Sequence, residues 1–270
     1  MLGAIFGDIV GSAYEFDNTD DYNFKLLTDQ SCPTDDTYMT LAVANALMDS
    51  THYNDKLTYD ALASEMHRIG NKHREANYGD MFFDWLLSDE PEPYNSFGNG
   101  SAMRVSSVGW LYNSLQKTIH YARMSAFVTH NHPEGIKGAE AVAVCIFFAR
   151  NGKSKEFIRS YVKENYYDLS DSSRFHYFDE TCMGTVPVAI NCFLNSTNYY
   201  DAIRKAVSHG GDSDTIACIT GGIAEAHYGL PADCTKVICS RIKDKELLGI
   251  IDKFSRYKRP RIDYMGQKLP

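Results

Sequence analysis

Apolar residues recur at intervals of three and four along most of the chain, the spacing that places them on one face of an α-helix. This periodicity predicts an N-terminal helix and helices over 37–49, 57–70, 135–152, 154–165, 186–196, 199–209 and 214–229. Stretches of alternating apolar and polar residues, which would indicate strands, are few and short. The pattern therefore predicts an all-α protein.

Two segments interrupt the helical pattern and are expected to be loops. Residues 88–101 contain two prolines and two glycines, and residues 166–182 are largely polar. Long loops within a compact domain often carry function. Because no repeat, low-complexity tract or linker divides the sequence, residues 1–270 are expected to form a single domain.

Composition narrows the possible functions. The formal net charge of −8, from 27 basic and 35 acidic residues, argues against a protein that clamps a nucleic-acid backbone. Seven scattered cysteines without a Cys-x-x-Cys pair are more typical of reduced thiols than of a disulfide framework or a zinc site. The apolar N-terminal stretch lacks a basic region and is interrupted by Asp8 and Glu15. It is therefore interpreted as neither a signal peptide nor a membrane span, and a cytoplasmic protein is expected.

Two loop-to-helix junctions, far apart in the sequence, carry similar side chains. Residues 34–36 read Thr-Asp-Asp, and residues 212–215 read Asp-Ser-Asp-Thr after a glycine pair. Either junction alone is most simply a helix cap. Together they offer four carboxylates and two threonine hydroxyls, a hard oxygen set suited to Mg²⁺, Mn²⁺ or Ca²⁺ and not to zinc. Because crowded carboxylates repel one another, a binuclear site is the economical hypothesis if the fold brings the junctions together.

The N-terminal helix carries a second candidate group. Glycine recurs every four residues from Gly3 to Gly11, which would let another helix pack closely against it. Asp8, Ser12 and Glu15 form a neighbouring polar stripe. A solvated face is the simplest interpretation of that stripe. The alternative is a carboxylate that reaches a metal or a water molecule.

Two further segments could contact an anionic ligand. The glycine-rich turn of residues 95–104 can direct backbone N–H groups toward a diphosphate, although a plain turn between helices is the simpler interpretation. It is not a P-loop, because no Gly-Lys-Ser/Thr follows. Residues 129–133 contain His130 and His132, with no nearby Cys or third His to support zinc. Capping of the helix that begins near Glu134 and hydrogen bonding to a phosphate both remain open.

Taken in order, five segments resemble the ADP-ribosylglycohydrolase family. They are GAIFGDIVGSAYEF, PTDDTYMTLAVANAL, SFGNGSAMRV, THNHPEGIKGAEAVA and GGDSDTIACITGGIAEAHYG. Each is weak alone, whereas their joint occurrence in this order is specific. The chain after about residue 240 has no counterpart in this match. The resemblance implies a compact, mostly orthogonal helical bundle with two Mg²⁺ (or Mn²⁺) ions in a cleft.

The resemblance also implies roles for individual residues. The metal ligands would be Thr34, Asp35, Asp36, Asp212, Asp214 and Thr215. The ADP-ribose site would be formed by Ser96, Phe97, Gly98, Asn99, Gly100, Ser101 and His130. Glu15, Asp35 and Asp36 are the catalytic candidates, and Glu15 matches a glutamate that contacts a metal and can gate the site in serine-directed members. Either Asp35 or Glu15 could be the general base.

The implied activity is hydrolysis of the glycosidic bond that joins ADP-ribose to an acceptor, through an oxocarbenium-like transition state. The expected partners are ADP-ribose and an ADP-ribosylated substrate, with neither a membrane nor a nucleic-acid backbone involved. An isoprenoid synthase is excluded because Asp35-Asp36 lacks the third carboxylate of Asp-Asp-x-x-Asp. A haloacid-dehalogenase phosphatase is excluded because Asp212-Ser213-Asp214 does not follow a strand. The remaining alternative is an inactive relative that binds ADP-ribose or is purely structural.

Overall fold

The computed structural model describes residues 1–50, 54–170 and 177–257. Within these ranges the regular secondary structure is helical, apart from an isolated bridge between Gly98 and Thr181. The all-α prediction is confirmed. The elements are α1 (Leu2–Gly11), η1 (Ser12–Tyr14), α2 (Asp35–Asp49), α3 (Asp55–Lys72), α4 (Asp80–Leu87), α5 (Gly100–Met103), α6 (Ser106–Leu111), α7 (Leu115–Phe127), α8 (Pro133–Arg150), α9 (Lys155–Asn165), α10 (Cys182–Leu194), α11 (Tyr199–Val207), α12 (Ser213–Tyr228), α13 (Ala232–Arg241) and α14 (Lys245–Arg256).

The predicted helical ranges correspond to α1–α3 and α8–α12. The largest difference is at α10, which begins at Cys182 and not near residue 186, because the Thr181 hydroxyl caps it and Pro187 lies inside the helix. Six helices, α4–α7, α13 and α14, had no predicted range. The predicted loop 88–101 ends where α5 starts. Of the predicted loop 166–182, residues 171–176 lie outside the described residues, and the described remainder is irregular as far as the start of α10.

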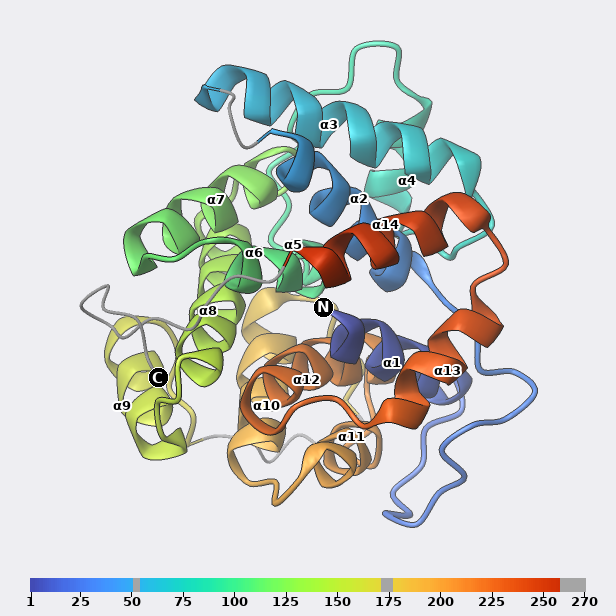
Figure 1. Ribbon diagram of the computed structural model, residues 1–270, viewed down its shortest axis with the longest axis vertical. Helices are drawn as coiled ribbons and strands as arrows, with labels where there is room; N and C mark the ends of the chain where they lie inside the picture. The colour runs from blue at the N-terminus through green and yellow to red at the C-terminus, as the bar shows by residue number, and fades with distance from the viewer. Residues whose placement is uncertain (51–53, 171–176, 258–270) are drawn as a thin grey trace.

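Helices α8 and α12 are buried on nearly every face and form the centre of the molecule. Helix α1 lies directly along α12 (Figure 1). A Cβ atom on Gly7 would overlap the carbonyl group of Ala217, and one on Gly11 would crowd the Ser213 carbonyl. Close packing is therefore the role of the glycine stripe. As a result, the C-terminal end of α1 meets the N-terminal end of α12.

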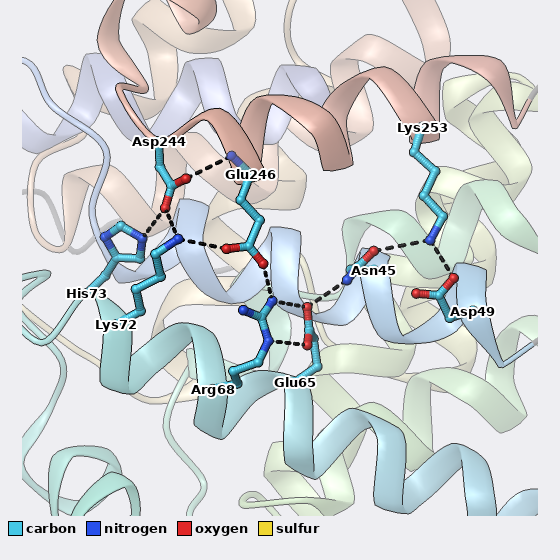
Figure 2. Close-up of polar contacts among 9 residues, drawn as sticks. All are labelled: Asn45, Asp49, Glu65, Arg68, Lys72, His73, Asp244, Glu246 and Lys253. Carbon is cyan, nitrogen blue, oxygen red and sulfur yellow. Dashed lines mark hydrogen bonds and ion pairs between the residues drawn. The ribbon is translucent and has the colours of Figure 1, made fainter.

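Helix α14 belongs to the part of the chain that the sequence motifs did not cover. It packs across α2 (Figure 1), and a network of polar side chains links it to α2 and α3 (Figure 2). Asp244, its N-cap, lies 2.6 Å from Lys72 Nζ and 3.1 Å from His73 Nε2. Glu246 lies 2.7 Å from Lys72 Nζ and 2.6 Å from Arg68 Nη2. Figure 2 also shows Lys253 reaching α2 near the other end of α14.

Of the helices in the described ranges, none combines the length and the apolar character that crossing a membrane requires.

Candidate active site

The two Asp-rich junctions lie side by side at one cavity of about 480 Å³. Thr34 is the N-cap of α2 and Asp212 is the N-cap of α12. The hydroxyl of Thr215 in α12 donates a hydrogen bond to Asp36 Oδ2 in α2 at 3.2 Å. The fold therefore brings together the two segments that the sequence hypothesis requires to meet.

The carboxylates at these junctions form two overlapping groups of three. Oxygen atoms of Asp8, Asp36 and Asp214 lie within 4.8 Å of one another, and so do oxygen atoms of Glu15, Asp212 and Asp214. Asp214 belongs to both groups. Two adjacent all-oxygen positions that share one carboxylate are the arrangement a binuclear site for hard cations needs.

The Asp36 carboxylate shows that the cluster fits a cation. Its Oδ2 accepts the hydrogen bond from Thr215, whereas its Oδ1 is buried and has no hydrogen-bond partner among the described residues. A buried carboxylate oxygen without a partner is costly, and a cation ligated there would satisfy it.

Asp8 corrects the interpretation of the N-terminal polar stripe, because it is fully buried and does not lie on a solvated face. Its Oδ1 accepts a hydrogen bond from the Thr34 hydroxyl at 2.7 Å. Its Oδ2 accepts the backbone N–H groups of Thr34 and Thr37, at 3.1 and 3.2 Å, and the Thr37 hydroxyl. Asp8 thus caps the start of α2 from a neighbouring helix.

Burial and mutual repulsion disfavour ionisation throughout the cluster. Burial raises the pKa of Asp8 to about 6, although hydrogen bonds from Thr37 and Thr34 counteract it. Burial and the charge of Asp212 raise the pKa of Glu15 to about 7. Burial first, and neighbouring carboxylates second, hold the pKa well above its usual range for Asp35, Asp36, Asp212 and Asp214. Divalent cations would relieve this repulsion.

Hydrogen bonds of Asn99 connect the glycine-rich turn to the acidic cluster. The Asn99 amide donates hydrogen bonds to Asp212 Oδ2 at 2.6 Å and to Thr185 Oγ1 at 2.9 Å. Two N–H groups of the turn are already engaged, since that of Gly98 donates to Ser96 Oγ and that of Asn99 donates to a backbone carbonyl. The turn therefore has fewer N–H groups free for a diphosphate than the sequence suggested.

Most of the residues singled out in the sequence line the cavity: Glu15, Asp35, Asp36, Ser96, Gly98, Asn99, Gly100, His130, Asp212, Asp214 and Thr215. Three others do not line it. The Thr34 hydroxyl is turned to Asp8, and the Ser101 hydroxyl donates to the carbonyl of Gly135 at 2.6 Å. Phe97 is 46% exposed beside the His132 ring.

The two histidines on either side of residue 131 lie in different surroundings. The His132 side chain accepts the N–H of Glu134 and so caps α8. His130 is buried and lines the cavity.

Sequence reasoning missed the aromatic part of the cavity wall, which consists of Phe16, Tyr78, Phe82, Tyr94 and Phe178. Phe16 and Phe178 stack with ring centroids 6.2 Å apart, and both are exposed. Four of the five residues lie in irregular segments, where hydrophobic periodicity carries no signal. They add apolar faces to the cavity that also holds the acidic residues.

Comparison with known proteins agrees with this geometry. The sequence profile of the ADP-ribosylglycohydrolase family matches residues 1–260. The chain belongs to the ADP-ribosylglycohydrolase family. The matched range extends through α14, beyond the segments on which the sequence resemblance was based.

Family relatives are similar over most of their length. ADP-ribosylhydrolase ARH3 of Bos taurus is 26% identical in an alignment 306 positions long, which spans 85% of this chain and 84% of that protein. ADP-ribosylarginine hydrolase Tri1 of Serratia proteamaculans (strain 568) is 25% identical in an alignment 303 positions long, which spans 98% of this chain and 80% of that protein. A solved structure described as an ADP-ribosylglycohydrolase-related protein complex matches with a TM-score of 0.70 at 20% identity, over 96% of this chain and 97% of that one. This likeness confirms the fold.

Proposed function

We propose that this family member hydrolyses the glycosidic bond between ADP-ribose and an acceptor, and that it does so with two Mg²⁺ or Mn²⁺ ions. The observation that carries the proposal is the pair of carboxylate groups that share Asp214 at one end of the cavity. Family membership supports ADP-ribose chemistry, and the unpartnered Asp36 oxygen supports a bound cation.

The proposed cation ligands are the two junctions together with the glutamate of the first motif. They are Glu15, Thr34, Asp35, Asp36, Asp212, Asp214 and Thr215. Asp8 is the one further candidate. It either ligates a cation beside Asp36 or serves only as the hydrogen-bond acceptor at the start of α2. When bound, divalent cations would supply Lewis acidity and a fixed position for substrate hydroxyl groups.

The rest of the cavity suits ADP-ribose. A volume of about 480 Å³ lies in the range typical of small-molecule sites. We propose that the diphosphate lies against the turn of residues 96–101 and His130. Among the aromatic residues that line the cavity, we propose that Tyr78 and Phe82 contact the adenine base. With its diphosphate and adenine held in this way, the ligand would present its distal ribose to the carboxylates.

The bond-breaking step needs a base near C1″ of that ribose. In the proposed reaction a water molecule forms a bond to C1″ while the bond to the acceptor breaks, and a carboxylate accepts the water's proton. The acceptor leaves with the bonding electron pair and takes up a proton. Glu15 and Asp35 both line the cavity and both stay candidates. If one of them is the base, its amide variant should lose the acidic limb of the pH–rate profile while still binding ADP-ribose.

The test is a hydrolysis panel of arginine-, serine- and O-acetyl-linked ADP-ribose, run with Mg²⁺, with Mn²⁺ and with chelator. We expect at least one linkage to release ADP-ribose and an unmodified acceptor, only when cations are present. AMP as the product would identify cleavage at the diphosphate and reject a glycosidase. If no linkage is cleaved although ADP-ribose binds, the alternative of an inactive binder is correct.

A further inference from the structure

Arg104 is a buried cation in the cavity wall. Its side chain is 1% exposed, and it lines the cavity. Its Nη2 donates hydrogen bonds to the Ser125 carbonyl at 3.1 Å and to the Thr129 hydroxyl at 2.7 Å. Its Nε has no hydrogen-bond partner in the described part of the chain. Burying a cation with a donor left unpaired costs desolvation free energy, so packing alone does not account for Arg104 at this position.

The Thr129 hydroxyl connects Arg104 to a histidine. The same Oγ1 lies 2.7 Å from His130 Nδ1. A guanidinium can only donate hydrogen bonds, so the Thr129 oxygen accepts from Arg104. Its own hydrogen is then available to Nδ1. If Nδ1 accepts that hydrogen bond, the neutral ring must carry its single proton on Nε2.

The other ring nitrogen faces the ligand turn. A Cβ atom on Gly100 would lie 3.1 Å from His130 Nε2, and one on Gly98 would lie 3.6 Å from it. Burial, and after it the charge of Arg104, hold the pKa of His130 well below its usual range. The ring therefore stays neutral at pH values where a free histidine titrates.

We propose that Arg104, acting through the Thr129 hydroxyl, is a positioning residue that fixes His130 in the tautomer with its proton on Nε2, so that a neutral N–H donor faces an anionic group in the cavity. The identity of that group, the ADP-ribose diphosphate, rests on the proposed function. The tautomer is a property of the ligand-free protein and can be measured separately.

The Tyr94 phenol is the competing acceptor. Its ring centroid lies 6.0 Å from that of His130, and its hydroxyl interacts with Thr129. If Thr129 donated to Tyr94, Nδ1 would have to carry the ring proton. Nε2 would then face the cavity as an acceptor and repel a phosphate oxygen. The two arrangements differ in which nitrogen of the His130 ring carries the proton, so a measurement of that position decides between them.

Nitrogen NMR of ligand-free protein labelled with ¹⁵N at histidine distinguishes the two. The His130 signals are assigned by their loss in His130→Gln. We expect a protonated Nε2 and an unprotonated Nδ1 that do not change from about pH 5.5 to about pH 8. A proton on Nδ1, or a ring that titrates near the ordinary pKa of about 6.5, would overturn the proposal. The tautomer is read from the parent protein, and His130→Gln serves only to assign the signals.

Two variants test the consequence for binding. Thr129→Val removes the hydroxyl with little change in shape, and Thr129→Ser keeps it. We expect the valine variant to lose the fixed tautomer and to bind ADP-ribose about tenfold more weakly, while the serine variant keeps both properties. Equal affinities for the two variants would overturn the positioning role. If the parent shows the expected tautomer but does not bind ADP-ribose, the proposed function fails and the tautomer assignment stands.

Discussion

Replacing Asp244 with alanine should destabilise the protein more than its surface position suggests. Asp244 accepts the N–H of Glu246 at 2.8 Å as the N-cap of α14, and it also contacts Lys72 and His73 (Figure 2). The lost cap costs about 1 kcal/mol. The exposed ion pair contributes about 0.5 kcal/mol, and the contact with His73 at most about 1 kcal/mol. Asp244→Ala should therefore lower the free energy of unfolding by about 2 kcal/mol.

The matched control is Asp252→Ala in the same helix. Within the described residues, the ion-pair partner of Asp252 is Arg256, one turn further on, and both side chains are more than half exposed. Such a pair is worth about 0.3–0.5 kcal/mol. Both variants are compared with the parent by urea unfolding followed by circular dichroism, with the denaturant dependence (m-value) required to stay constant. If the two variants lose the same stability, the network in Figure 2 does not hold α14 in place.

The difference in stability between the parent and Asp244→Ala should decrease as the pH falls. The contact with Lys72, more than any other, lowers the pKa of Asp244 to about 2 from the ordinary value of 3.8. A lowered pKa means that Asp244 stabilises the native state above its ordinary value and ceases to do so as the pH falls toward 2. The stability gap between parent and Asp244→Ala should therefore narrow under acid, and a gap that widens there contradicts the assigned contacts.

Three further outcomes follow from the site and the core. Mg²⁺ should bind more tightly as the pH rises from 5 to 8. The raised pKa values of Asp8 and Glu15, about 6 and 7, keep both groups protonated at the lower pH, so a cation must displace those protons. An affinity that does not change with pH in calorimetric titration would rule out their participation. Asp214→Asn should abolish the rise in melting temperature that Mg²⁺ produces, whereas the exposed Asp20→Asn should keep it. Gly7→Ala should cost about 1–3 kcal/mol or more, because its Cβ would overlap the backbone of α12. Gly249→Ala, in open space on α14, should instead gain about 0.5–1 kcal/mol, and similar losses for both glycines in urea unfolding would contradict the packing described here.

Hydrophobic periodicity predicted α1–α3 and α8–α12, and it missed α4–α7, α13 and α14. Helix α6 spans only Ser106–Leu111, which is too short to show a repeat. Helix α14 buries an apolar face that includes Leu247, Ile250 and Ile251, but it follows the last recognisable motif and had no predicted range. Pro187 led to a late start for α10, because a proline inside a helix is locally unfavourable and only surrounding packing allows it.

The site was predictable where its residues repeat a local pattern. The two Asp-Thr junctions have the same chemistry, so the sequence indicated a shared site on the condition that the fold brings them together. The role of Asp8 could not, because it caps α2 from another helix and the contact spans 26 residues. The link from Asn99 to Asp212 is equally non-local, because the partners are 113 positions apart in the sequence. Hydrogen bonds of this kind arise only when the close packing of α1 on α12 has set the distances.

Anomalous diffraction from crystals grown with Mn²⁺ and ADP-ribose tests the central claim most directly. The proposed site predicts two Mn²⁺ peaks roughly 3.5–4 Å apart, the usual spacing of a two-metal centre. Asp214 should lie between them, with Asp36 on one ion and Asp212 on the other. The distal ribose should face both ions. A single peak, no peak, or ions bound away from the carboxylates of α2 and α12 would contradict the binuclear site.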